Sequence, residues 1–303
     1  METGLSPASP HALARWLPLM PWVFVLIWST GFVVARFGMP HAPPLSFLSL
    51  RYVLSALCLA AWSIAAGARW PRERSQWGHL AVTGVLLHAG YLGGVWAAVK
   101  SGMGAGTAAL LVGLQPVLTA LWLSARAERG GGAAWREWAG LLLGLAGLTL
   151  VVQGKLGIGE VTGWNLSLAL LALLSITIGT LYQKRHVAPC DVRTANTVQL
   201  LAALAVSLPF ALLETESMRW HPELIGAMAW SILVLTIGGS SLLYLLIQRG
   251  AATRVASLLY LVPPCTAALA WWLFGEAFTG VMLLGVLLTV IGVAMVVRIP
   301  TRP

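Results

Sequence analysis

Ten long apolar runs, separated by short connectors that carry nearly all of the charges, dominate this sequence. A helix needs about 20 apolar residues to cross the hydrocarbon core of a bilayer, because each residue advances the helix by about 1.5 Å. A strand of a membrane barrel would instead show about 10 residues of alternating hydrophobicity. The sequence therefore predicts an all-α integral membrane protein with ten transmembrane helices, at residues 17–36, 44–66, 78–99, 104–125, 135–153, 164–183, 194–213, 226–247, 253–274 and 279–297.

The charged residues indicate how these helices are oriented. They make up only 10% of the chain, whereas a soluble domain has about 25%. The net charge of +9 would suggest nucleic-acid binding in a soluble protein. Here the cations lie in short loops between apolar runs, so we expect a lipid bilayer and no nucleic acid as partner. If the N-terminus is cytoplasmic, fourteen cations lie on the inside and four on the outside. The positive-inside rule then predicts a multi-pass inner-membrane protein with both termini in the cytoplasm.

The sequence also contains an internal repeat. A shift of 148 residues aligns two glycine pairs, a proline pair and a glutamate pair: Gly31 with Gly179, Gly102 with Gly250, Pro116 with Pro264, and Glu128 with Glu276. Each half, 1–155 and 156–303, is expected to hold five helices, and this odd number makes the second half enter the membrane upside down. Inverted repeats of this kind recur in secondary transporters, whose substrate site lies near the midplane between the halves.

Three stretches of the chain resemble those of known transporters. They are Ala97–Arg129, with Lys100-Ser101-Gly102, Leu114-Gln115-Pro116 and Ala127-Glu128-Arg129; Gly179–Arg185; and Ala256–Pro264, followed by Gly275-Glu276. They are similar to the fourth, sixth and ninth helices of EamA-type transporters in the drug/metabolite transporter superfamily, and the likeness covers nearly the whole chain. The resemblance implies a ten-helix inner-membrane carrier, usually an exporter, with a central cavity formed largely by helices 1, 3, 4, 6, 8 and 9.

Two polar side chains interrupt the apolar pattern of the predicted helices, whereas Asp and Glu are absent from the middle of every one. Carboxylate-based proton coupling is therefore not expected. His88 lies near the middle of the third helix, three residues before Tyr91, and is either a substrate-binding or proton-linked group or a neutral histidine bonded to another helix. Arg51 lies two turns into the second helix. It is a candidate gating residue or partner of an anionic substrate group, or it braces the structure or reaches the headgroups. Its counterpart in the repeat is Gln199.

Several other residues have predicted roles in gating or in structure. Pro116 and Pro264 lie at symmetric places in the fourth and ninth helices and are candidate hinges, because proline kinks a helix and frees a carbonyl. Glu128 and Glu276 are expected to bind the unpaired N–H groups that open the next helix. Small residues permit close helix packing, and we assign this role to the glycines that share one face of the fifth and tenth helices: Gly140, Gly144, Gly147, Gly285 and Gly292.

The other candidates for substrate contact are neutral or aromatic, as suits a pocket with apolar walls and a few polar groups. Gln115, next to the first proline, is one of them, and Trp96 and Tyr244 occupy equivalent repeat positions. The remaining candidates are Trp28, Thr30, Tyr91, Thr180, Tyr182, Ser240 and Tyr260. The three cysteines lie far apart with no histidine in ligand spacing, so neither a metal site nor a cofactor is expected.

These patterns together predict a transporter rather than an enzyme. The sequence has no GxSxG or HExxH motif, and His88 has no carboxylate partner within a predicted helix. We expect an alternating-access exporter of a small neutral or zwitterionic metabolite, amino-acid-like or aromatic, working as a monomer or a weak homodimer. A passive channel for small solutes is the first alternative. A membrane-embedded enzyme and a sensor or scaffold are the others.

Overall fold

The computed structural model describes residues 19–126, 135–156, 159–242, 261–276 and 279–297, and these residues form helices and connecting turns without a strand. The π-helical segments are named η. In chain order the elements are α2 (Met20–Gly38), α3 (Pro44–Ala65), α4 (Arg74–Gly84), η1 (Val85–Gly90), α5 (Tyr91–Lys100), α6 (Ala105–Val112), α7 (Gln115–Arg126), α8 (Trp135–Leu156), α9 (Gly163–His186), α10 (Val192–Ala211), α11 (Pro222–Ala229), η2 (Trp230–Gly238), α14 (Val262–Phe274) and α15 (Gly280–Val297).

Each of the ten predicted helices overlaps helix in the structure, although residues 243–260, which include parts of the eighth and ninth, lie outside the described residues. Six continuous helices are long and apolar enough to cross a membrane: Met20–Gly38, Pro44–Ala65, Arg74–Lys100, Gly163–His186, Val192–Ala211 and Pro222–Leu242. Four shorter apolar helices account for the others: Ala105–Thr119, Trp138–Gln153, Val262–Phe274 and Gly280–Met295. The predicted all-helical membrane class is confirmed in the described residues. The count of ten crossings and the cytoplasmic position of both termini stay predictions.

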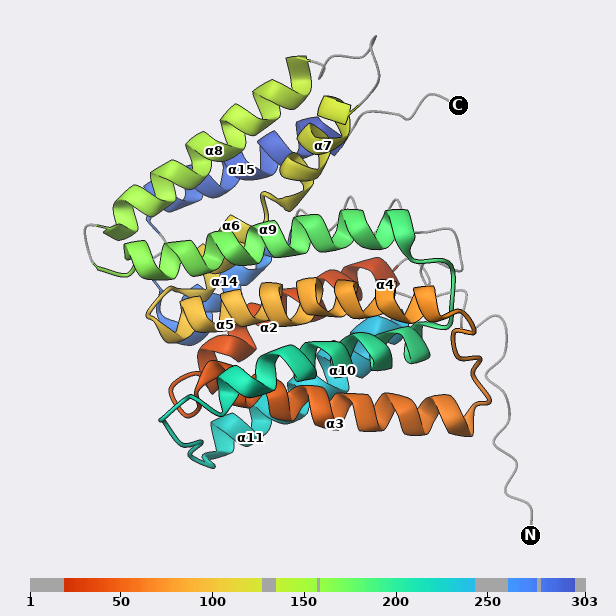
Figure 1. Ribbon diagram of the computed structural model, residues 1–303. Helices are drawn as coiled ribbons and strands as arrows, with labels where there is room; N and C mark the ends of the chain where they lie inside the picture. The colour runs from red at the N-terminus through yellow and green to blue at the C-terminus, as the bar shows by residue number, and fades with distance from the viewer. Residues whose placement is uncertain (1–18, 127–134, 157–158, 243–260, 277–278, 298–303) are drawn as a thin grey trace.

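Helices from the two halves pack against each other in equivalent pairs. α3 lies along α10, α6 packs on α14, and α8 lies along α15. In Figure 1, α8 and α15 form one flank of the bundle, with α7 beside them, while α3 and α10 lie side by side away from that flank. These pairs join the second helix to the seventh, the fourth to the ninth and the fifth to the tenth. They are the contacts that a two-fold axis between the halves would give.

The pairing of α8 with α15 depends on glycine. A Cβ atom added to Gly147 would lie 2.3 Å from the carbonyl oxygen of Gly285, and one added to Gly292 would lie 2.4 Å from that of Gly140. The two backbones therefore touch directly, as small residues in membrane helices permit. The close packing predicted for this glycine face is what the structure has.

Candidate functional site

A buried arginine lies at the centre of the candidate site. Arg51 of α3 is only 7% exposed, so it points into the helix packing and does not reach toward the lipid headgroups. Its Nη2 donates to Thr236 Oγ1 of η2 at 3.3 Å, and its Nε has no hydrogen-bond partner among the described residues. A buried guanidinium bonded to one neutral hydroxyl retains most of its capacity to bind an anionic group.

A buried histidine lies beside this arginine. His88 belongs to η1, and its Nδ1 has no hydrogen-bond partner in the described part of the chain. The side chain of Gln199 of α10 lies beside that of His88. Tyr52 Oη donates to the main-chain carbonyl of His88 at 2.8 Å, and the Tyr52 and His88 rings meet edge to face with centroids 6.1 Å apart. The neighbouring helices thus fix the position of the histidine while one ring nitrogen stays open.

These contacts form two pairs that the internal repeat relates to each other. The shift of 148 residues places Arg51 on Gln199 and His88 on Thr236. The contact of Arg51 with Thr236 is therefore equivalent to the contact of Gln199 with His88, and each joins one half to the other. The segments η1 and η2 end at equivalent glycines, Gly90 and Gly238. Because π-helical turns occur frequently at functional sites, their presence in both halves marks this region.

Buried polar atoms without a partner concentrate in the same place. Of six such side-chain atoms among the described residues, five lie on α3, η1 and η2: Ser49 Oγ, Arg51 Nε, Ser55 Oγ, His88 Nδ1 and Ser231 Oγ. More than about 90% of buried polar groups in proteins have a hydrogen-bond partner. A concentration of exceptions between three helices is typical of a site that binds a polar molecule.

The hydrogen bond from Tyr52 supports the irregular backbone of η1. We expect Tyr52→Phe to lower the free energy of unfolding by about 1 kcal/mol, because it removes the side-chain hydrogen bond to the carbonyl of His88. Thermal unfolding in detergent measures the effect. Tyr182→Phe is a matched control, because its hydroxyl bonds His79 at the far end of α9, away from η1. Equal melting temperatures of the Tyr52→Phe variant and the wild type would contradict the assignment.

A second polar contact joins two predicted site residues. Gln115 Nε2 donates to Thr180 Oγ1 at 3.1 Å, which links α7 to α9. Gln115 is the first residue of α7 and follows a break in the fourth predicted helix at Gly113 and Leu114. Pro116 is therefore in the first turn of a new helix, where its missing N–H needs no acceptor. The fourth predicted helix is thus irregular at Gly113 and Leu114, where α6 ends and α7 begins.

Pro264 has a comparable place in the second half, at the third position of α14. The preceding residue, Pro263, packs against the break in the fourth helix, since a Cβ added to Gly113 would lie 2.7 Å from Pro263 Cγ. The two proline regions therefore meet. Whether they act as hinges stays a prediction.

The other predicted substrate contacts divide by location. Tyr91 is buried one helical turn after His88, and Ser240 is partly buried just after η2. Trp96 is 1% exposed and stacks on Phe47 with centroids 4.6 Å apart, so it is a core residue rather than a lining one. Two further candidates contact other aromatic or polar groups: Trp28 packs on Phe24, and Thr30 accepts a hydrogen bond from Trp230 Nε1 at 2.9 Å. Tyr244, Tyr260 and Glu128 lie outside the described residues.

Tyr182 lies at the end of the bundle predicted to face the cytoplasm, away from Arg51. It bonds His79 Nδ1 at 2.9 Å and stacks on His186 with centroids 4.4 Å apart. Near this end Asp191 caps α10 by accepting from the main-chain N–H of Arg193 at 2.9 Å. The Arg193 side chain also bonds this carboxylate and thereby lowers the pKa of Asp191. These groups belong to the end of the bundle and not to the polar pairs between the halves.

Glu276 binds a different helix from the one expected. Its Oε1 accepts from the main-chain N–H of Ala105 at 3.0 Å, at the start of α6, while α15 is capped by Thr279. Glu160 accepts from the N–H of Gly104 at 3.1 Å and is paired with Lys155. Two carboxylates thus converge on the positive end of α6, where an anion is favoured. Glu276 therefore binds the start of α6 and not the start of the following helix, which the sequence had indicated.

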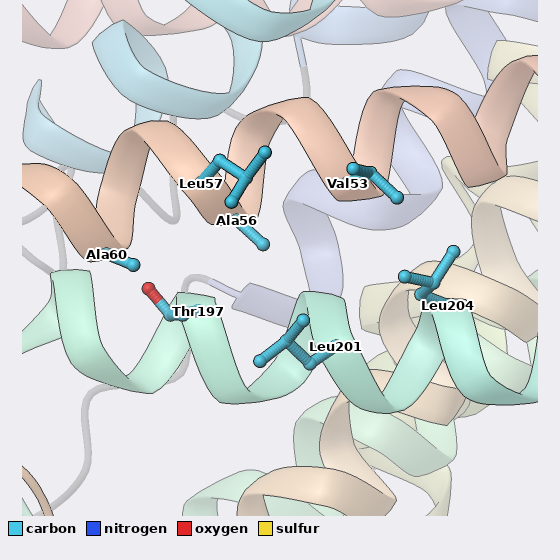
Figure 2. A pocket seen from close by; sticks show the side chains of 7 residues that line it. All are labelled: Val53, Ala56, Leu57, Ala60, Thr197, Leu201 and Leu204. Atoms are coloured by element: carbon cyan, nitrogen blue, oxygen red, sulfur yellow. The ribbon is translucent and has the colours of Figure 1, made fainter.

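Figure 2 shows an apolar groove between α3 and α10. The side chains that line it are Val53, Ala56, Leu57, Ala60, Thr197, Leu201 and Leu204. Leu57 is 62% exposed, and the hydroxyl of Thr197 donates to the carbonyl of Arg193. The groove therefore offers no free polar group, and it suits lipid contact better than a polar solute.

Comparison with known proteins gives consistent matches over most of the chain. The EamA-like transporter family model matches residues 17–153 and 163–298. The "Uncharacterized inner membrane transporter YedA" of Escherichia coli (strain K12) is 28% identical over 292 residues, which cover 91% of this chain and 92% of that protein. The "Probable amino-acid metabolite efflux pump" of Salmonella typhimurium is 28% identical over 282 residues, 88% of this chain and 90% of that one. A crystal structure with 21% identity has a TM-score of 0.64 and covers 91% of this chain and 94% of its own, which supports a shared fold.

Proposed function

This chain belongs to the EamA-like transporter family and is a multi-pass protein of the inner membrane, and from that premise we propose that it exports a small neutral or zwitterionic metabolite by alternating access. The substrate is amino-acid-like or aromatic. Its site lies between the two five-helix halves, around Arg51 and His88. The two polar pairs related by the repeat are the single observation that carries this proposal.

The pairs suit alternating access because each crosses from one half to the other. Arg51 of the first half bonds Thr236 of the second, and Gln199 of the second half lies beside His88 of the first. In a carrier built from inverted repeats, each half adopts in one state the arrangement that the other half has in the opposite state. The transition would therefore tighten one pair while it loosens the other. Both pairs include a neutral partner, so neither requires the separation of two opposite charges.

The charge of the site bounds the chemistry of the substrate. Arg51 is a single cation well inside a predicted helix, and the predicted helices have no carboxylate in their middle. One guanidinium matches one carboxylate, which it can bind with two parallel hydrogen bonds. A strongly anionic substrate would need further cations, and a strongly cationic one would need an acid. The name of the Salmonella relative, an amino-acid metabolite efflux pump, supports the same substrate class.

The proposal is tested by flux from proteoliposomes loaded with a mixed pool of amino acids and small metabolites. Mass spectrometry identifies what leaves over time, with and without a pH gradient and at several internal concentrations. Selective, saturable release is expected and names the substrate class. Release of many solutes without saturation would indicate a channel and not a carrier. Release no greater than from empty liposomes, with folded protein, would overturn transport and favour a sensor.

Substitution of the histidine checks the position of the site. We expect His88→Ala to reduce saturable release about tenfold, because the substitution removes a buried polar group of the site, and one hydrogen bond contributes about 1–1.5 kcal/mol, close to the 1.4 kcal/mol that corresponds to a factor of ten. His186→Ala removes an exposed histidine from one end of the bundle and serves as the matched control. If His186→Ala lost release and His88→Ala did not, the substrate site would lie away from the two polar pairs.

A further inference from the structure

A loop of the first half and a connector of the second half form a polar seam at one end of the bundle. The loop, residues 39–43, joins α2 to α3, and the connector, residues 212–221, joins α10 to α11. Arg219 donates from Nη2 to the carbonyl of Pro40 at 2.9 Å and from its main-chain N–H to that of His41 at 2.8 Å. We call this contact the loop seam, and it lies on the face predicted to be outside.

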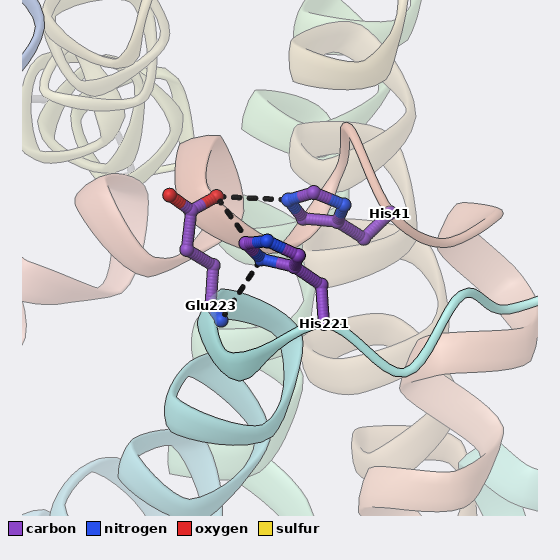
Figure 3. Close-up of side chains that lie close together, drawn as sticks. All are labelled: His41, His221 and Glu223. Carbon is purple, nitrogen blue, oxygen red and sulfur yellow. Dashed lines mark hydrogen bonds and ion pairs between the residues drawn. The ribbon is translucent and has the colours of Figure 1, made fainter.

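Three side chains with metal-binding atoms meet at the loop seam. Figure 3 shows His41 extending from the first-half loop toward His221 and Glu223, which lie at the start of α11. His41 Nε2 is 2.8 Å from Glu223 Oε2, and His221 Nδ1 is 3.9 Å from the same oxygen. One ligand atom from each residue lies within 4.8 Å of the other two. The two imidazoles stack with centroids 4.5 Å apart.

These separations are close to those around a bound zinc ion. Zn–N and Zn–O distances of about 2.0–2.2 Å in a tetrahedral site place ligand atoms roughly 3.3 Å apart. The pair at 2.8 Å would need to open slightly and the pair at 3.9 Å to close slightly. One imidazole would also have to turn out of the stack, whose ring planes differ by 12°, so that both ring nitrogens point at the ion. The ion would have to replace the hydrogen bond that His221 Nδ1 now accepts from the main-chain N–H of Glu223. This bond is weak, because the two nitrogens are 3.4 Å apart.

The donor set decides the class of ion. Two imidazoles and one carboxylate suit zinc and similar divalent transition metals, whereas calcium and magnesium prefer oxygen ligands. Three protein ligands leave a fourth tetrahedral position for water. Water can reach this position, because the side chains of His221 and Glu223 are about half exposed.

We propose that His41, His221 and Glu223 form a binding site for a divalent transition-metal ion such as Zn²⁺, and that the bound ion fastens the two halves together at the loop seam. His41 belongs to the first half, and the other two ligands belong to the second. An ion held by all three therefore stabilises the arrangement in which the seam is closed. Metal binding at this site does not depend on the proposed function, whereas the effect of the ion on transport rests on it.

Calorimetric titration with zinc chloride tests the site directly. The protein is purified in detergent, stripped with EDTA and freed of any histidine tag. We expect one ion per chain in the wild type and at least tenfold weaker binding in His41→Ala, His221→Ala and Glu223→Gln. His186→Ala, which removes an exposed histidine from the opposite end, is expected to bind as the wild type does. Wild-type affinity and stoichiometry in both His41→Ala and His221→Ala would overturn the proposal.

Two further measurements make the test independent of folding and of transport. Zinc is expected to raise the melting temperature of the wild type and of His186→Ala, because a ligand of the folded state stabilises that state, but not that of His221→Ala. Since the side chain of His221 is about half exposed and its hydrogen bond from the N–H of Glu223 is long, its replacement should leave the fold intact. External zinc is expected to inhibit wild-type flux more than His221→Ala flux. Absent flux with retained zinc binding would refute the transport proposal alone, whereas equal inhibition of both proteins would refute the fastening of the seam.

Discussion

Replacement of Arg51 by methionine is expected to reduce saturable release tenfold to roughly a hundredfold while the melting temperature stays equal or rises. The loss of flux follows because a hydrogen bond to a charged group contributes about 1.5–3 kcal/mol and about 1.4 kcal/mol corresponds to a factor of ten. The unchanged stability follows because burial of a guanidinium costs desolvation energy that one hydroxyl at 3.3 Å offsets only in part. An apolar side chain of similar length removes that cost.

Two further variants distinguish a substrate-binding role of Arg51 from a purely structural role. Thr236→Val removes the acceptor of Arg51 but keeps the cation, so release should fall by less than in Arg51→Met. Arg51→Lys keeps the charge but loses the planar fork that matches a carboxylate, and it should give intermediate release. If Arg51→Met lowered the melting temperature strongly and left release unchanged, the arginine would be a structural brace and the site would lie elsewhere.

Gly84→Ala is expected to have the largest effect on stability, lowering the free energy of unfolding by about 3 kcal/mol. A Cβ at this position would lie 2.2 Å from the main-chain oxygen of Gln199 and 2.5 Å from its Cα. The obstacle is backbone, so rotation of a side chain cannot relieve it, and α4 must move away from α10. We expect a decrease in melting temperature of about 5–10 °C.

The matched control is Gly226→Ala in α11. A Cβ at Gly226 would have no neighbouring atom within 4 Å, so this variant changes only helix propensity, which favours alanine by up to about 1 kcal/mol. The two alanine variants should shift the melting temperature in opposite directions. A Gly84→Ala protein as stable as the wild type would mean that α4 and α10 do not approach as closely as described.

Hydropathy predicted the helices well because length and apolar content are properties of whole segments. The second predicted helix, 44–66, is α3 at Pro44–Ala65, and the sixth, 164–183, lies within α9 at Gly163–His186. The break at Gly113 and Leu114 and the turns of η1 and η2 were not predicted. Each of these features depends on which carbonyl accepts the hydrogen bond from a few main-chain N–H groups. The mean hydropathy of a whole apolar run contains no information on that pairing.

The candidate site was predicted in part, for a physical reason. Arg51 and His88 were evident because polar groups are rare inside membrane helices. The repeat shift relates Arg51 to Gln199 and His88 to Thr236, but it does not show which of these residues contact each other. Tyr52 carried no such signal, because an aromatic residue in an apolar run is equally suited to packing. The meeting of His41 with His221 joins loops from opposite halves of the chain, and only the folded arrangement of those loops reveals it.

The π-helical turns of η1 and η2 also bear on the ancestry of the protein. A π turn holds one more residue than the α turn it replaces, and the two segments end at glycines that the repeat shift places on each other, Gly90 and Gly238. Independent insertions at matching places would be a coincidence, whereas a single insertion before the ancestral gene duplicated accounts for both.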